Sequence, residues 1–218
     1  MPVTRLFLVR HGQSAGNAAG RFGGHGPTPL SELGVQQAER TAKALLEENI
    51  TAIYSSDLYR AVQTAEPLSR LTGIPVHTKA EFRERNVGVL EGLTFEESRQ
   101  RYPDDYFALV RRNLDYTITG GESYRDLIHR TMKQLWKVVG KHSGGRIVIF
   151  SHTGAICFMT LSLLGAIRRS SKTAPWITTS NCGITRFEIR GRRNIRLLAV
   201  NDTSHLTEKT GNDSFAAL

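Results

Sequence analysis

Residues 4–12 read TRLFLVRHG, in which a mostly apolar run stops abruptly at Arg10, His11 and Gly12. A short apolar run that ends in polar residues and a glycine predicts a buried β-strand. Arg10 and His11 would then leave the sheet at the carboxyl end of this strand, in a loop. We therefore expect the first chemically active side chains at one edge of a sheet.

A second stretch of the chain has the same form. Residues 146–150 read RIVIF, the strongest strand pattern in the sequence, and Ser151, His152, Thr153 and Gly154 follow before a helical pattern. Open parallel sheets bind ligands beyond the carboxyl ends of their strands, so the two stretches are expected to meet at one edge. For either histidine taken alone, a structural role with hydrogen-bonded ring nitrogens is the commoner alternative.

Strand and helix patterns alternate along the chain. Apolar runs predict strands at residues 4–9, 52–54, 74–77, 146–150, 183–189 and 195–200. Apolar residues at helical spacing predict helices at residues 31–46, 57–68, 95–112 with a break at Pro103, 124–139 and 155–164. The alternation predicts an α/β fold, a three-layer α/β/α sandwich around a mainly parallel sheet to which the last hairpin adds an antiparallel strand.

The composition is that of an ordinary globular protein. Of the 218 residues, 39% are hydrophobic and 22% are charged, which fits one soluble domain over residues 1–218. Residues 94–142 predict a helical, cap-like insertion that covers a pocket, and residues 207–218 predict a C-terminal tail. The first residues do not resemble a secretory signal, and no apolar run approaches the roughly 18 residues of a membrane span. We therefore expect a cytoplasmic protein with no membrane partner.

The charge balance favours anionic partners, because 29 Lys and Arg residues against 20 Asp and Glu give a net charge of +9. Phosphorylated metabolites, nucleic acid and acidic membranes all satisfy that condition. Part of the excess positive charge lies in the last predicted hairpin, where a solvated face is expected at Arg190, Arg192, Arg193 and Arg196. Cys157 and Cys182 lie outside metal-ligand spacing and are predicted to be buried. No metal-binding or nucleotide-binding motif occurs, so no metal and no cofactor is expected.

Three motifs together carry a family resemblance. LVRHGQS at residues 8–14 is followed by Asn17, SSDLYRAVQTA occupies residues 55–65, and SHTG occupies residues 151–154. In this order and spacing they resemble the histidine phosphatase superfamily, the phosphoglycerate mutase-like group, whose RHG motif closes the first strand. Shorter matching segments extend the resemblance to nearly the whole chain, at residues 30–34, 82–84, 91–92, 120–123 and 201–206.

The resemblance implies a nucleophile and a clamp for phosphate. His11 would attack a phosphate monoester and form a phosphohistidine intermediate, which splits the transfer into two steps. Arg10 and Arg60 would hold the dianionic phosphate, because a planar guanidinium stays charged and binds phosphate oxygens in pairs. His152, just before a helix, would stabilise charge on the transferring oxygens. Viewed on its own helix, Arg60 fits a surface ion pair equally well.

The same reaction requires an acid for the leaving group and later a base for water, and one carboxyl group can serve both steps. The resemblance places this group at Glu84, in the segment FRE of residues 82–84. Glu81 and Glu91 are nearby alternatives whose charges could simply be solvated.

Several neighbouring residues are weaker candidates for substrate binding. Asn17 is implied as a neutral donor to phosphate, whereas the hydroxyls of Ser14 and Thr153 could instead cap turns or helices. Two positions depart from the family pattern, since Gly23 stands where relatives often have glutamine and Pro27 where aspartate is usual. The missing side chain at Gly23 predicts that a bulkier or differently shaped substrate is admitted there.

The family includes phosphoglycerate mutases, bisphosphatase domains, and protein and small-molecule phosphatases, so the fold does not settle the reaction. Mutases typically carry an Arg-Arg-Ser stretch that binds substrate. In this chain, the segment of residues 94–119 has only the similar stretch Arg111, Arg112 and Asn113. We therefore expect a metal-independent phosphatase of small phosphorylated metabolites, most like bacterial broad-specificity phosphatases. A cofactor-dependent phosphoglycerate mutase is the alternative. A non-catalytic phosphate binder or nucleic-acid binder ranks lower, no nucleic acid is expected as a partner, and a homodimer is left open.

Overall fold

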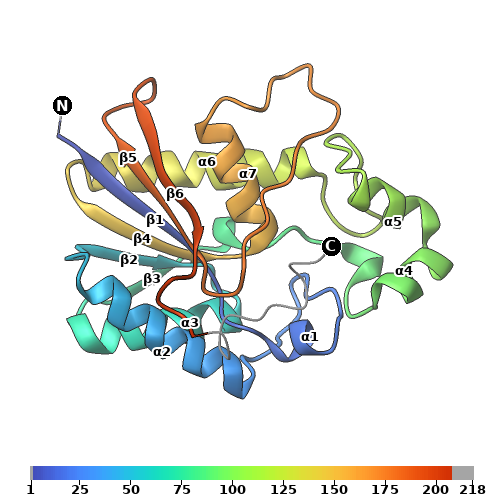
Figure 1. Ribbon diagram of the computed structural model, residues 1–218. Coiled ribbons are helices and arrows are strands. Elements are labelled where there is room, and N and C mark those ends of the chain that lie inside the picture. Colours follow the sequence, from blue (N-terminus) through green and yellow to red (C-terminus); the bar gives the residue numbers. More distant parts are fainter. Residues whose placement is uncertain (1, 208–218) are drawn as a thin grey trace.

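A six-stranded sheet lies at the centre of the computed structural model, which describes residues 2–207 (Figure 1). The strands are β1 (Thr4–Arg10), β2 (Ala52–Ser55), β3 (Val76–Thr78), β4 (Arg146–Ser151), β5 (Ile184–Ile189) and β6 (Ile195–Asp202). Their order is β3-β2-β4-β1-β5-β6, with the first four parallel. Both β5 and β6 run antiparallel to their neighbours, so the sheet is mixed. The predicted α/β sandwich with a mainly parallel sheet is confirmed.

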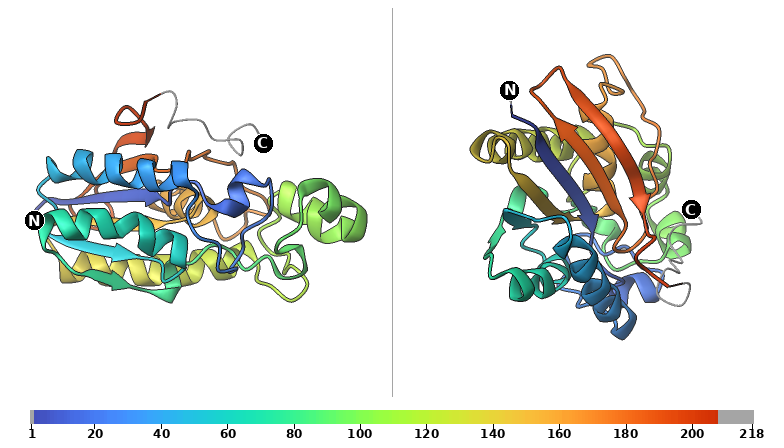
Figure 2. Two further views of the ribbon diagram at one scale, coloured as in Figure 1. Left: turned by 90° about the horizontal axis from the view of Figure 1, so that it is seen from below. Right: turned by 60° about the vertical axis from the view of Figure 1, so that its left-hand side comes forward.

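Helices cover both faces of this sheet (Figure 2). They are α1 (Ala15–Ala18), α2 (Glu32–Leu46), α3 (Tyr59–Thr72), α4 (Phe95–Arg101), α5 (Pro103–Val110), α6 (Tyr124–Lys141) and α7 (Thr153–Leu163). Helices α2 and α3 share a core with one face, and α6 and α7 share a core with the other. Single 3-10 turns occur at Ala80–Phe82 and Gly88–Leu90.

The segment predicted as a cap, residues 94–142, is divided in the structure. Helices α4 and α5 lie beyond the end of the sheet, whereas α6 runs along one of its faces (Figure 1). Only the first of these two parts is therefore placed to cover a site at the strand ends. The tail predicted at residues 207–218 lies outside the described residues, apart from Thr207.

Strand β1 shows why both helical layers are needed. Leu6 and Leu8 belong to the core beneath α6 and α7, whereas Phe7 and Val9 belong to the core beneath α2 and α3. All four side chains are buried. Successive side chains of a strand point to opposite faces, so a strand covered on both sides is a continuous apolar run.

The ends of several elements follow from local chemistry. The helix predicted from residue 31 begins at this point, where Ser31 caps α2 because its hydroxyl accepts from the backbone N–H of Gly34 at 3.1 Å. Pro103 separates α4 from α5, also as predicted, and stands in the first turn of α5, where its missing N–H costs nothing. Strand β3 begins at Val76, later than predicted, because Pro75 has no N–H to donate to the ladder.

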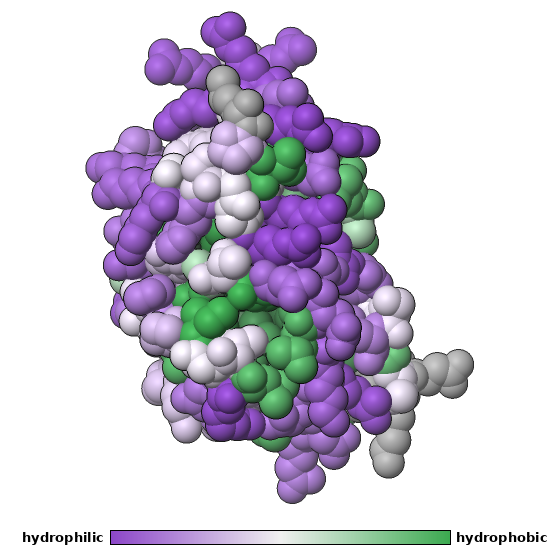
Figure 3. All heavy atoms as spheres, turned by 90° about the vertical axis from the view of Figure 1, so that its left-hand side faces the viewer, coloured by the Kyte–Doolittle hydropathy of each residue, from purple (hydrophilic) through white to green (hydrophobic). Residues whose placement is uncertain are grey.

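The surface agrees with two further predictions. The hairpin arginines are exposed, at Arg190, Arg192, Arg193 and Arg196. Cys157 and Cys182 are fully buried, and burial raises the pKa of both thiols to about 12. The face shown in Figure 3 is mainly hydrophilic, with apolar residues gathered near its centre. Within residues 2–207, no helix is long and apolar enough to cross a bilayer.

Candidate active site

The two motif histidines meet at the carboxyl ends of adjacent strands. Arg10 pairs in register with Ser151 across β1 and β4, so the residues that follow them leave the sheet side by side. The rings of His11 and His152 are buried, with centroids 5.1 Å apart. Neighbouring strands lie about 4.8 Å apart, so the strand register itself sets this distance. The structure thus brings both motifs to one edge, where their strand-end positions predicted them.

The hydrogen bonds of His11 define its tautomer. Its Nδ1 lies 2.7 Å from the carbonyl oxygen of Gly12, and its Nε2 accepts from Nε of Arg60 at 3.2 Å. A carbonyl oxygen can only accept, so Nδ1 carries the proton and Nε2 keeps its lone pair. Burial lowers the pKa of His11 well below its usual value, and the charges of Arg60 and Arg10 lower it further. His11 is therefore neutral at pH 7, with an unprotonated Nε2.

Two buried arginines line the same cavity as His11. Arg60, near the start of α3, donates to the carbonyl oxygens of Gly24 and Gly26 at 2.8 and 3.1 Å. Burial lowers the pKa of Arg60 to about 10, which leaves it a cation at neutral pH. Arg10 donates to the carbonyl oxygen of Thr179, in the segment that precedes β5. Backbone carbonyls thus orient both guanidinium groups.

Glu84 is the carboxylate that lines this cavity. Its Oε1 accepts from the next backbone N–H at 2.8 Å, and its Oε2 accepts from the N–H of Gly154 at 2.9 Å, in the first turn of α7. A Cβ on Gly154 would lie 2.4 Å from Oε1, so a glycine is needed for this close approach. Within residues 2–207, Glu81 and Glu91 do not line the cavity, and the Glu91 carboxylate instead accepts from the backbone N–H of His25.

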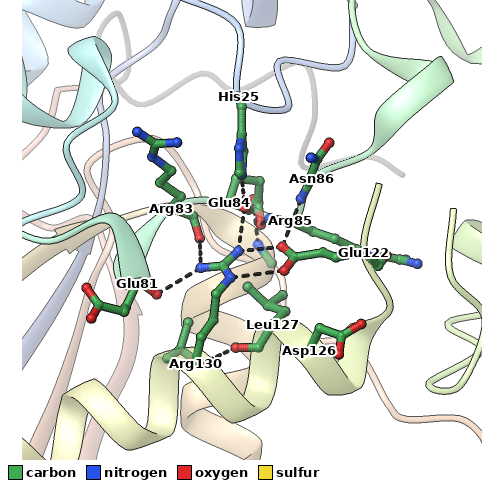
Figure 4. A network of polar contacts seen from close by, with 12 residues as sticks. His25, Glu81, Arg83, Glu84, Arg85, Asn86, Glu122, Asp126, Leu127 and Arg130 are labelled. Atoms are coloured by element: carbon green, nitrogen blue, oxygen red, sulfur yellow. Dashed lines mark hydrogen bonds and ion pairs between the residues drawn. The ribbon is translucent and has the colours of Figure 1, made fainter. Parts of the chain in front are cut away.

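An arginine that sequence reasoning missed holds the loop that carries Glu84. Arg130 of α6 donates to the carbonyl oxygens of Glu81, Arg83 and Glu84 at 2.8, 2.9 and 2.7 Å (Figure 4). Its remaining N–H groups pair with the Glu122 carboxylate at 3.0 and 2.5 Å. An irregular loop has carbonyls without strand partners, and one planar fork satisfies three of them here. Glu122 lies in a segment that matches the family, but no sequence signal pointed to Arg130.

His152 lies against His11 but, within the described residues, does not line the cavity. Its Nε2 is 2.9 Å from the hydroxyl of Ser56, and its buried Nδ1 has no partner among residues 2–207. Burial, then the charges of Arg60 and His11, lower the pKa of His152 well below its usual value. Asn181, which sequence reasoning also missed, donates to the carbonyl oxygen of His11 at 2.9 Å.

The weaker candidates have local structural partners as well. Asn17 Oδ1 accepts from the backbone N–H and the hydroxyl of Ser14 at 3.2 and 3.1 Å, which forms a capping box on α1. The hydroxyl of Thr153 accepts from that of Thr179 at 3.0 Å. Asn17, Ser14 and Thr153 all line the cavity. Within the described chain, Asn17 Nδ2 makes no hydrogen bond, so it is the donor of this group best placed for a phosphate oxygen.

The cavity above these groups has a volume of about 260 Å³. Gly23 lines it beside Arg60, and a Cβ at Gly23 would lie 3.7 Å from Cζ of Arg60, in ordinary contact. The rest of the wall is largely apolar or aromatic, with Phe22, Val87, Phe95, Tyr106, Leu109, Val110, Tyr124 and Trp176. Within residues 2–207, no group of three or more His, Cys, Asp or Glu side chains is arranged to hold a metal ion.

A neutral histidine with an unprotonated Nε2, two buried arginines and a carboxylate at one sheet edge are the kinds of groups that phosphoryl transfer requires. Residues 6–203 match the family described as the histidine phosphatase superfamily (branch 1), and the chain belongs to that family. The resemblance expected from the sequence is thereby confirmed.

Two proteins of Arabidopsis thaliana are similar in sequence. A metal-independent phosphoserine phosphatase is 39% identical over 157 residues, which cover 71% of this chain and 66% of that protein's length. Phosphoglycerate mutase-like protein 4 is 34% identical over 209 residues, which cover 94% of this chain and 88% of that protein. Among solved structures, a mycobacterial glucosyl-3-phosphoglycerate phosphatase bound to VO3 has a TM-score of 0.80 at 28% identity, covering 91% of this chain and 99% of that one.

Proposed function

We propose that this protein is a phosphatase that hydrolyses phosphomonoesters of small metabolites through a phosphohistidine at His11. The observation that carries the proposal is the hydrogen-bonded tautomer of His11, with Nδ1–H on Gly12 and an unprotonated Nε2 that accepts from Arg60, in a cavity that Arg10 also lines. The relatives named as phosphoserine phosphatase and glucosyl-3-phosphoglycerate phosphatase support the same reaction on small phosphorylated substrates. The name of the plant relative also supports metal independence.

In the first step, Nε2 of His11 attacks phosphorus and the bond from phosphorus to the ester oxygen breaks. Arg10 and Arg60 hold the phosphate oxygens and balance their charge, and Asn17 Nδ2 adds a neutral donor. Protonated Glu84 gives its proton to the departing alkoxide, because an alcohol leaves far more readily than its anion. The carbonyl of Gly12 stabilises the positive charge that develops on the imidazole.

In the second step, the Glu84 carboxylate takes a proton from water, and the resulting hydroxide attacks phosphorus. The bond between phosphorus and Nε2 breaks, which releases inorganic phosphate and restores neutral His11 with protonated Glu84. One carboxyl group thus serves both steps in turn. His152 packs against His11. It stabilises the transferring oxygens or holds the ring of the nucleophile in place.

The test compares wild-type protein with His11→Ala in excess EDTA, on O-phosphoserine, 3-phosphoglycerate and 4-nitrophenyl phosphate. We expect phosphate release from the wild type and a loss of about a thousandfold or more in the variant. Rapid quenching at high pH should trap phosphate on the peptide that contains His11, as an acid-labile adduct seen by mass spectrometry. Undiminished release by His11→Ala would overturn the proposal.

A phosphoglycerate mutase remains the second candidate, because one relative is named phosphoglycerate mutase-like protein 4. The same assay distinguishes the two reactions when 3-phosphoglycerate is supplied with bisphosphoglycerate. Formation of 2-phosphoglycerate faster than free phosphate would favour the mutase. We expect hydrolysis to be faster, since residues 94–119 carry Arg111, Arg112 and Asn113 in place of the Arg-Arg-Ser stretch that is typical of mutases.

A further inference from the structure

The cavity has two chemically different halves. Its inner half holds the cations and polar groups around His11, whereas helices α4 and α5 and the segment before β5 line the outer half. Phe22 and Phe95 face each other there, with ring centroids 4.5 Å apart. Val110, at the end of α5, is 41% exposed although it lines the cavity. Apolar surface exposed inside a cavity is typical of a site for an apolar ligand group.

Within residues 2–207, the Arg112 side chain in this outer half has neither an ion pair nor a hydrogen bond. Arg112 lies over Trp176, with Cζ 5.4 Å from the ring centroid. Arg21, by contrast, pairs with Glu97 at 3.0 Å, and Arg85 donates to backbone carbonyls. Stacking on Trp176 orients the guanidinium without neutralising it.

The backbone conformation of Arg112 also indicates that the structure holds this cation in a particular position. Its φ is 55°, in the left-handed region that residues with a Cβ rarely adopt. The chain leaves α5 at this point, and Asn113 then donates to the carbonyl of Ala108. Strained conformations of this kind are kept where the surrounding structure requires them, often at binding sites.

We propose that the outer half of the cavity binds the leaving group of the substrate, and that this group has an apolar or aromatic body and an anionic far end, such as a carboxylate. The apolar wall contacts the body and Arg112 pairs with the anion. The proposal rests on the proposed function, because the phosphate at His11 defines which part of the substrate reaches the outer half.

The first test compares benzyl phosphate with glycerol 1-phosphate, both esters of primary alcohols. We expect kcat/KM to be about tenfold or more higher for the benzyl ester, because its ring is removed from water against the wall. Val110→Ser should reduce this preference about threefold. Phe107→Ser is the matched control, since Phe107 is on the same helix, 43% exposed, and not among the described residues that line the cavity.

The second test adds 4-carboxybenzyl phosphate, which carries an anion at the far end of the same body. We expect kcat/KM about fivefold to tenfold above that of benzyl phosphate, as for a partly exposed ion pair, and a loss of this advantage in Arg112→Gln. Arg111→Gln is the control, because Arg111 stacks on Phe107 outside the cavity lining of the described chain and should leave the advantage intact.

Three outcomes are informative. Equal kcat/KM for benzyl and glycerol esters would overturn the apolar part of the proposal. The anionic part would be overturned if kcat/KM of the wild type were no higher for 4-carboxybenzyl phosphate than for benzyl phosphate. It would also be overturned if Arg112→Gln kept the higher value for the carboxylated ester. In both cases phosphate release dependent on His11 would continue, so the proposed function would stand, whereas loss of all hydrolysis in the wild type would count against the function itself.

Discussion

The floor and the outer wall of the cavity are built in opposite ways. The floor includes His11, Arg10 and Arg60, with His152 packed against His11, and none of these side chains is more than 4% exposed. The wall comes in part from the short helices α4 and α5 beyond the sheet, and most of its residues are only partly buried. Under the proposed function, the chemistry lies where the sheet register leaves little freedom, whereas selectivity lies where side chains can change at little cost to the fold.

This difference has a physical basis in how each region is held. Floor residues are held by many long-range contacts, such as the ladder of β1 with β4 and the carbonyls that bind Arg60. A shift in one of them would break several hydrogen bonds and bury unpaired polar groups. Changes in the wall alter only partly buried contacts, so we expect effects on KM and substrate preference there, and effects on kcat at the floor.

The largest expected effect after removal of His11 is at the proposed acid. Glu84→Gln should lower kcat about a thousandfold for O-phosphoserine, because the alkoxide then leaves without a proton. The loss should be much smaller for 4-nitrophenyl phosphate, whose leaving group needs no proton. Glu81→Gln is the control, since Glu81 does not line the described cavity. Equal losses at Glu81 and Glu84 would break the assignment.

Arg130→Lys tests the comparison of floor and wall by weakening the contacts that hold the loop of Glu84. Lysine keeps the charge but cannot reach three carbonyls and a carboxylate at once, so Glu84 should lose its position. We expect kcat to fall about tenfold to a hundredfold with KM nearly unchanged, and less so for 4-nitrophenyl phosphate. Arg125→Lys, on the same helix but paired with Asp115, should cost stability without this pattern. An equal loss of kcat for both esters would show that Arg130 has only a structural role.

Burial of the floor also predicts a dependence of stability on pH. The pKa of His11 and that of His152 are lowered in the fold, so the unfolded chain binds more protons as the pH falls below about 6.5. Stability should therefore decrease by about 1.4 kcal/mol per pH unit for each of these histidines below that pH. Burial also lowers the pKa of His142 and of His205, which act in the same direction.

Urea unfolding at several pH values between 5 and 7, followed by tryptophan fluorescence, measures this slope. His11→Asn should reduce it by the contribution of one histidine, because the asparagine does not titrate. An unchanged slope in that variant would mean that His11 titrates in the fold as it does in the unfolded chain.

The smallest expected effect is at the boundary between floor and wall. Gly23→Gln places a long side chain over Arg60, so benzyl phosphate should lose about tenfold in kcat/KM relative to O-phosphoserine. Gly23→Ala is the matched control, because a Cβ at this position makes only an ordinary contact. An unchanged order of substrate preference in Gly23→Gln would remove Gly23 as a determinant of specificity.

Much of the fold followed from short patterns in the chain. Apolar runs predicted the strands, and Ser31 and Pro103 predicted helix boundaries, because capping and the missing N–H of proline act locally. Helix α1 was missed, since a single turn is too short to show a period. The strand-end motifs predicted that His11 and His152 would meet, because adjacent parallel strands end at the same edge.

The positions that sequence reasoning missed reach the site from distant segments. Arg130 approaches from the middle of a helix, Asn181 from the turn before β5, and Trp176 from an irregular stretch between α7 and β5. None lies in a repeating pattern or beside a strand end. Their roles depend on which segments pack together, and neither hydrophobic period nor local propensity contains that information.

The sequence by itself determined which strands and helices follow one another along the chain. The family motifs identified the histidines, arginines and Glu84 as candidates. These properties are local, because periodicity, capping and motif spacing act over a few neighbouring residues. Only the tertiary structure decided which nitrogen of His11 carries the proton, how Arg130 holds the loop of Glu84, and which side chains line the outer half of the cavity. Those properties depend on distances of a few ångström between residues far apart in the chain, and such distances exist only once the layers have packed.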